Sequence, residues 1–216
     1  MGMRLHDYAA SGNCYKARLL LALLGRPYER VAVDIFGGDT LTDAFAALNP
    51  VRETPVLELD DGTIVTQSSA ILWFLAEGTP FLPASPLERA QVVQWLAFEQ
   101  ERVMGGLGGA RFRCLTGRAT AQDPLIAGRL RLAREALDVL TAHLRDRDWL
   151  VGHNATIADV ASFAYTSRAG DIDLDPAGWP PVAAWLDRIR ALPGFLDDFV
   201  PYPPNARAGA GRSIYD

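Results

Sequence analysis

Cysteine and histidine are scarce in this chain of 216 residues, which contains two cysteines and three histidines. Cys14 and Cys114 stand far apart, so they provide neither a disulfide framework nor the paired spacing of a zinc site. The three histidines are equally scattered. The sequence therefore predicts that the protein uses no metal ion.

Long apolar runs and an excess of positive charge are also missing. No stretch approaches the roughly 18 apolar residues of a membrane span, and the first ten residues lack the apolar core of a signal peptide. We therefore expect a cytoplasmic protein without a membrane partner. The net charge of -5 argues against a nucleic-acid partner bound by a broad basic face. A hydrophobic content of 49% is typical of a soluble chain that buries a substantial core.

The most informative stretch is residues 53–71. Val56 to Leu59 is predicted to form a strand, and Pro55 stands at its start, where the missing N–H does least harm. Asp61-Gly62 predicts a two-residue hairpin turn with positive φ angles, after which Ile64 and Val65 form the returning strand.

A helix is predicted to follow this hairpin, with Ser68 as its cap before the apolar run at 71–75. A turn, a hairpin and a helix N-terminus then lie within reach of each other. Because N–H groups at a helix start attract negative charge, this arrangement predicts a site for a small anion.

The N-terminal part predicts an α/β domain over residues 1–78. We expect a strand at 3–8, a buried helix at 14–24 and a second strand at 28–34, which together form a right-handed parallel unit. A loop with one short helix at 36–48 leads into the hairpin and the helix described above.

The second part of the chain is predicted to be entirely helical. Residues 79–86 form a proline-rich linker, and helices are expected over 87–200. Residues 201–216 are rich in Pro, Gly and Ala, so this tail is expected to be either disordered or draped over the surface.

Two local patterns set helix starts in this region. Asp123-Pro124 predicts the beginning of an amphipathic helix, whose apolar residues recur at spacings of three and four. Thr156 and Asp159 have the spacing of a capping box, which we interpret as a structural element.

The order TPVLELDDGTIVTQSSAILWFLAE from Thr54, with TIADVA from Thr156, resembles the cytosolic glutathione transferases. The resemblance extends to about Pro201. It implies a thioredoxin-like N-terminal domain, an all-helical C-terminal domain and glutathione as co-substrate. It also implies a homodimer, with Trp73 and the helix after Ser85 near the interface.

The same resemblance implies roles for four residues of the central stretch. It implies a cis peptide before Pro55, backbone pairing of Thr54 with the cysteinyl part of glutathione, and contacts from Gln67 and Ser68 to the γ-glutamyl end.

The sequence departs from the family pattern at two positions. Glu53 stands where a basic residue is frequent, and Gln67 replaces a frequent glutamate. An acid at position 53 is expected to repel glutathione unless it points outward. Arg52 supplies a positive charge beside it, although a solvated Arg–Glu pair explains these two residues equally well.

The implied chemistry is the stabilisation of a bound thiolate by a hydrogen-bond donor. Ser11 matches the catalytic serine of the serine-type classes, and Asn13 matches an asparagine used near the sulfur in some bacterial members. Both residue types also cap helices, so both roles stay open. Tyr8 is a rival hydroxyl, with packing in the core as its alternative role. Cys14 is a rival nucleophile, which we interpret rather as a small buried residue.

The sequence is compatible with three functions. The first is a glutathione transferase that attacks a small apolar electrophile, with Phe98 and Arg102 as binding residues and Met104 and Phe112 as further candidates. The second is a glutathione-dependent disulfide or peroxide reductase that uses Asn13. The third is a non-catalytic binding module of the same fold. The glycines between 105 and 109 either widen the substrate cleft or permit close helix approach, and they lack the pattern of a phosphate loop.

Overall fold

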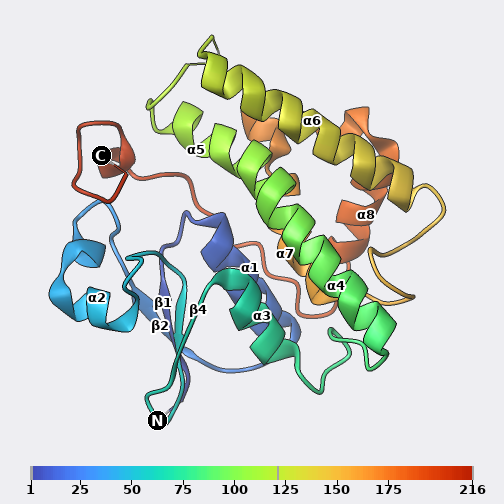
Figure 1. Ribbon diagram of the computed structural model, residues 1–216, viewed down its shortest axis with the longest axis horizontal. Helices are drawn as coiled ribbons and strands as arrows, with labels where there is room; N and C mark the ends of the chain where they lie inside the picture. The colour runs from blue at the N-terminus through green and yellow to red at the C-terminus, as the bar shows by residue number, and fades with distance from the viewer. Residues whose placement is uncertain (1, 121, 216) are drawn as a thin grey trace. The chain divides into compact units, whose positions relative to one another are not determined.

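The computed structural model describes residues 2–120 and 122–215 (Figure 1). The chain divides into two compact units. Residues 1–75 and 196–216 form the first unit, and residues 76–195 form the second. The C-terminal end of the chain therefore returns to the unit in which the chain begins.

A four-stranded sheet forms the centre of the first unit. Its strands are β1 (Arg4–Asp7), β2 (Glu29–Ala32), β3 (Val56–Glu58) and β4 (Ile64–Thr66), in the order β2-β1-β3-β4. Strand β1 pairs with β2 in parallel and with β3 in antiparallel orientation, and β3 and β4 form an antiparallel hairpin. This mixed sheet confirms the βαβ and ββα units predicted from the sequence.

Three helices cover the sheet. Helices α1 (Gly12–Leu23) and α3 (Ser68–Ala76) lie on one side of it, and α2 (Asp43–Leu48) lies on the other (Figure 1). A short 3₁₀ helix, Asp39–Leu41, precedes α2. The arrangement is the thioredoxin-like fold expected for this half of the chain.

Apolar residues on both faces of the central strands hold these layers together. Leu5 and Leu57 are direct partners across β1 and β3, and both are fully buried. On the α2 side, Val33, Phe45 and Val56 form a further buried cluster. A sheet covered on both faces needs such apolar side chains in both directions along its strands.

The hairpin differs from the predicted two-residue turn. The Leu59 N–H donates to the Thr63 carbonyl, and the Gly62 N–H donates to the Leu59 carbonyl, both at 2.9 Å. Three residues therefore form the loop, and Gly62, with φ at 84°, is the one that requires the left-handed region. This is the type I turn followed by a left-handed residue that three-residue hairpins favour.

The start of α3 also lies one residue from the predicted position. Ser68 is the first residue of the helix rather than its cap. Gln67 precedes it with φ at 67°, and its carbonyl accepts from the Ile71 N–H at 3.0 Å. The left-handed backbone at Gln67 turns the chain sharply out of β4 and into the helix.

Every regular element that the structure describes in the second unit is a helix. Asp123 caps its longest helix through the Leu125 N–H at 2.8 Å, as predicted. Its elements are α4 (Pro86–Phe98), the π-helical segment η2 (Glu99–Gly108), α5 (Gly109–Leu115), α6 (Pro124–Leu144), α7 (Ile157–Thr166), α8 (Pro180–Arg190) and the 3₁₀ helices Ala169–Ile172 and Pro176–Gly178.

The glycines of η2 permit close approach between helices, which was one of their two predicted roles. A Cβ atom on Gly106 would lie 2.7 Å from the backbone nitrogen of Ala133 in α6. A Cβ atom on Gly108 would lie 2.9 Å from the ring of Tyr165 in α7. Side chains at these two positions would force the packed helices apart.

The predicted capping box at Thr156 is present and extends into the core of the second unit. The Thr156 Oγ1 accepts from the Ala158 N–H at 3.2 Å, and Asp159 Oδ2 accepts from the Thr156 N–H at 2.9 Å. Asp159 Oδ1 also accepts from the Leu150 N–H and the Trp185 indole N–H. Burial raises the pKa of the fully buried Asp159 carboxyl, and these three donors offset part of that cost.

The C-terminal segment, residues 196–215, packs against the first unit. Near its start, the Arg18 Nε donates to Asp198 Oδ2 at 2.9 Å. Further along, the Asn205 side chain donates to Asp34 Oδ2 at 2.9 Å. Of the two states expected for the tail, the structure has the one in which it lies over the surface.

Replacing Thr156 with alanine removes the side-chain acceptor at the start of α7. We expect the free energy of unfolding to fall by about 1 kcal/mol, which corresponds to about 2–4 °C in the melting temperature of a chain of this size. Thermal unfolding measures the change. Ser85→Ala is the matched control, because Ser85 caps α4 without a side-chain hydrogen bond. Equal melting temperatures for both variants would contradict a structural role for Thr156.

Candidate functional site

Three segments of the first unit meet at one end of the sheet. In the register of the strands, Val56 lies opposite His6 on one side and opposite Thr66 on the other. Both neighbouring strands are antiparallel to β3, so the ends of β1 and β4 lie beside the start of β3, which directly follows Thr54 and Pro55. The Thr54–Pro55 peptide is cis, as the resemblance implies.

Ser11 stands at the N-terminus of α1, directly after this end of β1. Its N–H donates to the Tyr8 carbonyl at 2.9 Å, and its Oγ accepts from the Cys14 N–H at 3.3 Å. The structure confirms the capping role of Ser11. A cap uses the oxygen as an acceptor, so the hydroxyl still has a proton to donate.

Cys14 is a buried neutral thiol. Burial, followed by the Asp7 carboxylate, raises the pKa of Cys14 to about 12, against opposing hydrogen bonds with Thr54, the Tyr8 N–H and Ser11. The Tyr8 N–H donates to the sulfur at 3.4 Å. A thiol that is fully protonated at neutral pH and has no exposed surface is a poor nucleophile. Its sulfur instead links the Ser11 loop to the Thr54 loop.

Tyr8 contributes a buried hydroxyl beside this loop. The residue is 7% exposed, and its Oη has no hydrogen-bond partner among the described residues. Burial raises the pKa of Tyr8, and Tyr202, Asp34 and Cys14 add to the effect. The phenol is therefore neutral at physiological pH, and its ring packs edge-on against Phe36 at 5.8 Å.

Asn13 is half-buried in the first turn of α1. Its Oδ1 accepts from the Lys16 Nζ at 2.8 Å, and Lys16 itself is fully buried. This bond engages the amide oxygen of Asn13 and fixes the orientation of its side chain. The amide nitrogen is then the group that Asn13 can offer to a ligand.

The loop before Thr54 is ordered by Asn49, a buried residue that the sequence analysis did not identify. Its side chain donates to the Glu53 carbonyl at 2.8 Å and accepts from the Val51 N–H at 3.1 Å. The Asn49-Pro50 dipeptide is a turn signal that would have indicated this role.

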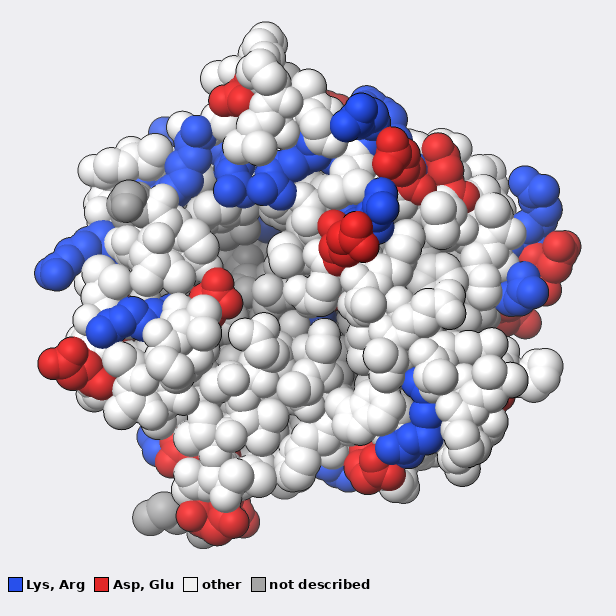
Figure 2. All heavy atoms as spheres, in the orientation of Figure 1, with Lys and Arg blue, Asp and Glu red and all other residues white. Residues whose placement is uncertain are grey.

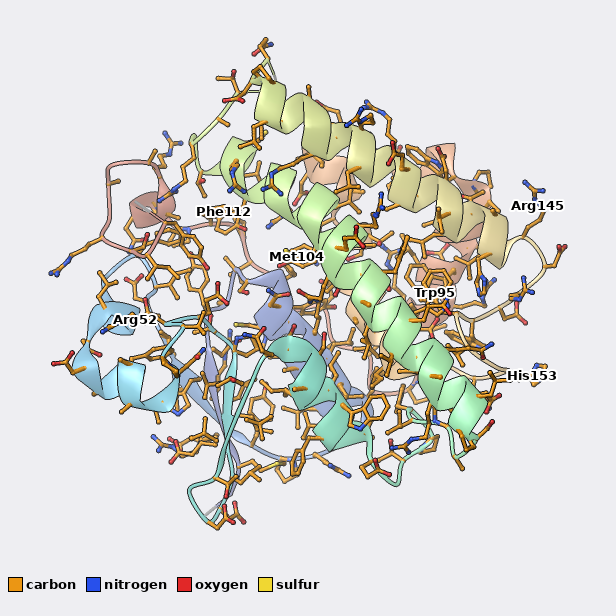
Figure 3. All side chains as sticks on the ribbon, viewed as in Figure 1. Arg52, Trp95, Met104, Phe112, Arg145 and His153 are labelled. Carbon is orange, nitrogen blue, oxygen red and sulfur yellow. The ribbon has the colours of Figure 1, made fainter. Side chains whose placement is uncertain are left out.

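Arg52 points toward the region of α2 (Figure 3). Its guanidinium donates to the carbonyls of Thr40 and Thr42, each at 3.0 Å, and lies 3.8 Å from the Asp43 carboxylate. Through these contacts the Arg52 guanidinium ties the loop before Thr54 to the residues around the start of α2. The structure therefore shows structural contacts for Arg52, and its role in binding glutathione stays a prediction.

Gln67 and Ser68 lie at the start of α3. Gln67 is exposed, whereas Ser68 is buried. The first N–H groups of a helix have no partner within it, so they attract an anion together with a nearby hydroxyl. This is the region where a γ-glutamyl carboxylate is expected.

Phe98 and Arg102 belong to the second unit. The Phe98 ring packs edge-on against Trp95 at 5.2 Å. Arg102 forms ion pairs with Glu101 at 3.3 Å and with Glu135 at 3.6 Å. These contacts give both residues a packing or surface role within their own unit.

Acidic and basic side chains both occur on the face shown in Figure 2, and several Lys and Arg side chains lie next to one another in its upper part. Within the part of the chain that the structure describes, no three His, Cys, Asp or Glu side chains gather in a way that could hold a metal ion. No helix among the described residues is both long and apolar enough to cross a membrane.

Comparison with known proteins assigns both halves of the chain. Residues 10–77 match the glutathione S-transferase N-terminal domain, and residues 107–193 match the glutathione S-transferase C-terminal domain. The crystal structure of a glutathione S-transferase from Xanthobacter autotrophicus is 43% identical, with a TM-score of 0.85 over 90% of this chain and 96% of that one.

Two other similar proteins bear on the site. A glutathione transferase homologue from Lodderomyces elongisporus, solved with two glutathione molecules per subunit, is 26% identical, with a TM-score of 0.80 over 90% of this chain and 95% of that one. The disulfide-bond oxidoreductase YfcG of Escherichia coli is 30% identical over 86% of this chain and 89% of its own length. The chain belongs to the glutathione S-transferase family, and it is an enzyme of that family.

The two cysteines are expected to react very differently with an alkylating reagent. Cys14 is fully buried with a pKa of about 12, so iodoacetamide at neutral pH should leave it unmodified in the folded protein. Cys114, which is half-buried, is the internal control and should react faster. Mass spectrometry of tryptic peptides reports both sites, and alkylation after unfolding should label both. Comparable rates in the folded protein would contradict the assignment of Cys14 as a structural thiol.

Proposed function

We propose that the protein is a glutathione S-transferase in which Ser11 stabilises the thiolate of bound glutathione. The observation that carries the proposal is the convergence of the Ser11 loop, the cis peptide before Pro55 and the start of α3 at one end of the sheet. Each of these segments offers donors to an anionic ligand.

The chemical step follows from the properties of thiols. A free thiol titrates near 8.5, so a small fraction is thiolate at neutral pH. A hydrogen bond from the Ser11 hydroxyl and the N-terminal end of α1 favour the anion and lower its pKa. The thiol proton leaves to solvent, the thiolate attacks a carbon of the electrophile, and a C–S bond forms as the leaving group departs or an addition product is protonated.

The rest of the tripeptide is assigned to the neighbouring segments. The Thr54 backbone pairs with the cysteinyl residue, and Gln67 and Ser68 bind the γ-glutamyl end. Asn13 is the second candidate donor near the sulfur, and Arg52 contributes positive charge. A small apolar electrophile is the second substrate, with Phe98 and Arg102 as candidate contacts. A cytoplasmic homodimer is the proposed state of the protein.

A glutathione-dependent disulfide reductase is the second candidate. The similarity to YfcG supports it, as does the burial of Cys14, because such an enzyme would have to use bound glutathione rather than a protein thiol. A conjugation assay with an electron-poor aryl halide and a reduction assay with a small disulfide separate the two activities. Retention on immobilised glutathione separates both from a non-catalytic module.

Ser11→Ala is expected to raise the pKa of bound glutathione. A hydrogen bond to a charged group contributes about 1.5–3 kcal/mol, which corresponds to a rise of about 1–2 pKa units. The thiolate is the reactive form, so the rate should fall near pH 7 and recover above the new pKa. The pH dependence of kcat measures the shift.

Loss of the helix cap must be separated from loss of the thiolate contact. Thr42→Ala provides the control, because Thr42 caps α2 through the Phe45 N–H at 3.2 Å. It should lower stability without moving the pH profile. An unchanged profile in Ser11→Ala would exclude Ser11 as the donor to sulfur.

Gln67→Ala is expected to weaken glutathione binding without changing the rate at saturation. Gln67 is proposed to contact the γ-glutamyl end, which lies away from the reacting sulfur, so its loss should raise KM and leave kcat unchanged. Titration calorimetry checks the affinity directly. An equal affinity in the variant would remove Gln67 from the site.

A further inference from the structure

Arg129 of α6 lies against the glycines of the neighbouring helix. Helix α6 runs alongside the continuous helix formed by α4, η2 and α5 (Figure 1). The Arg129 Nη1 donates to the Gly105 carbonyl. A Cβ atom on Gly109 would lie 2.9 Å from the Arg129 Cζ and 3.3 Å from its Cδ. Glycine at position 109 therefore gives the guanidinium its place, and a side chain there would displace it.

A second arginine lies against the same glycine. Arg113 of α5 donates through its Nη1 to the Gly109 carbonyl at 3.3 Å. The guanidiniums of Arg113 and Arg129 therefore both border Gly109, one at its carbonyl and the other at its Cα atom. Both residues are half-buried, so solvent screens their charges less than it would on an open surface.

These two positive charges have no counter-charge. Among the residues that the structure describes, no carboxylate pairs with Arg113 or Arg129, whereas Arg111 on the same helix as Arg113 pairs with Asp171 at 2.6 Å. The Arg129 Nε is buried without a hydrogen-bond partner among the described residues. Burial lowers the pKa of Arg129, and the charge of Arg113 lowers it further. An anion bound here would therefore satisfy charges that the described residues leave uncompensated.

Arg129 also lines an open cavity between η2 and α6. The cavity has a volume of about 570 Å³, and Arg102, Leu125 and Leu132 contribute to its lining. Arg102, a candidate contact of the electrophile, is already paired with two glutamates. Arg129 has no such pair, so it can receive an acidic group, while the two leucines can contact an apolar body.

We propose that the second substrate carries a carboxylate, which Arg129 binds with support from the charge of Arg113. The inference rests on the proposed function and deepens it, because it names the electrophile as an organic acid with an apolar body. Arginine presents its donors as a planar fork that matches the two oxygens of a carboxylate. Arg129 is thereby a specificity-determining residue that favours an acidic electrophile over a neutral one.

Two matched aryl chlorides test this inference. The para-chloro-meta-nitrobenzoate and the corresponding benzamide have the same reacting carbon and differ in charge. In both reactions the thiol proton of glutathione goes to solvent, a C–S bond forms, and chloride leaves with the electron pair of the C–Cl bond. Each kcat/KM is divided by the rate constant of the uncatalysed reaction, which removes the difference in intrinsic reactivity. The normalised ratio of acid to amide should exceed about ten in the wild type.

Substitutions around Gly109 should lower this ratio. Arg129→Gln should lower it about tenfold, the change expected from loss of one hydrogen bond to a charged group. Arg113→Gln should lower it about threefold, because it removes a neighbouring charge. Gly109→Ala displaces the Arg129 guanidinium and should act in the same direction.

Two control variants in the same unit should leave the ratio unchanged. Arg134→Gln removes an exposed positive charge from α6 and matches the change in net charge. Gly178→Ala adds a methyl group at an exposed glycine where a Cβ atom would meet nothing within 4 Å. Thermal unfolding verifies that each variant is folded, and Arg113→Gln and Gly109→Ala carry the test if Arg129→Gln fails to fold.

The outcomes distinguish this inference from the proposed function. Failure of the wild type to conjugate either chloride would overturn both. If both chlorides are conjugated, a normalised ratio near one in the wild type overturns only the inference. A ratio that is unchanged by Arg129→Gln and by Arg113→Gln also overturns it, since neither guanidinium would then contact the acidic group.

Discussion

The buried sulfur of Cys14 is the contact on which the geometry of the site depends. It accepts from the Tyr8 N–H at the end of β1 and hydrogen-bonds with the side chains of Ser11 and Thr54. One small side chain thereby connects the strand, the start of α1 and the loop before β3. Burial keeps its proton in place, so the thiol organises the site without competing with a thiol ligand.

A buried ionic network lies at the same end of the sheet. Arg18 in α1 is fully buried between Asp7 of β1 and Asp198 of the C-terminal segment, and Arg30 of β2 also pairs with Asp7. Burial alone would lower the pKa of Arg18, but the two carboxylates raise it and keep the guanidinium charged. Removing one partner would leave an uncompensated buried charge, so the network specifies where the segment lies more than it adds to stability.

The sequence predicted best where a local pattern determines the structure. Asp123 and Thr156 cap helices through atoms two or three residues away, so both starts were predicted correctly. The hairpin at Gly62 and the start of α3 at Ser68 depend on single φ values, which neighbouring residue types do not determine. The contact of Asn205 with Asp34 spans 171 positions and has no local signal. The sequence alone therefore does not decide between the two states expected for the tail.

The arrangement of charge explains how a site with an acidic neighbour can accommodate an anionic ligand. The guanidinium of Arg52 is engaged by backbone carbonyls, and Arg18 is engaged by buried carboxylates. Further donors near the end of β1 are the hydroxyls of Tyr8 and Ser11, the Asn13 amide and the N–H groups of helix starts. Such donors act over short distances and only in the correct orientation, whereas a cation attracts anions from every direction. A site built in this way selects its ligand by the spacing of the ligand's polar groups. Tyr8, which burial keeps neutral at physiological pH, is suited to that task because it can donate without adding charge.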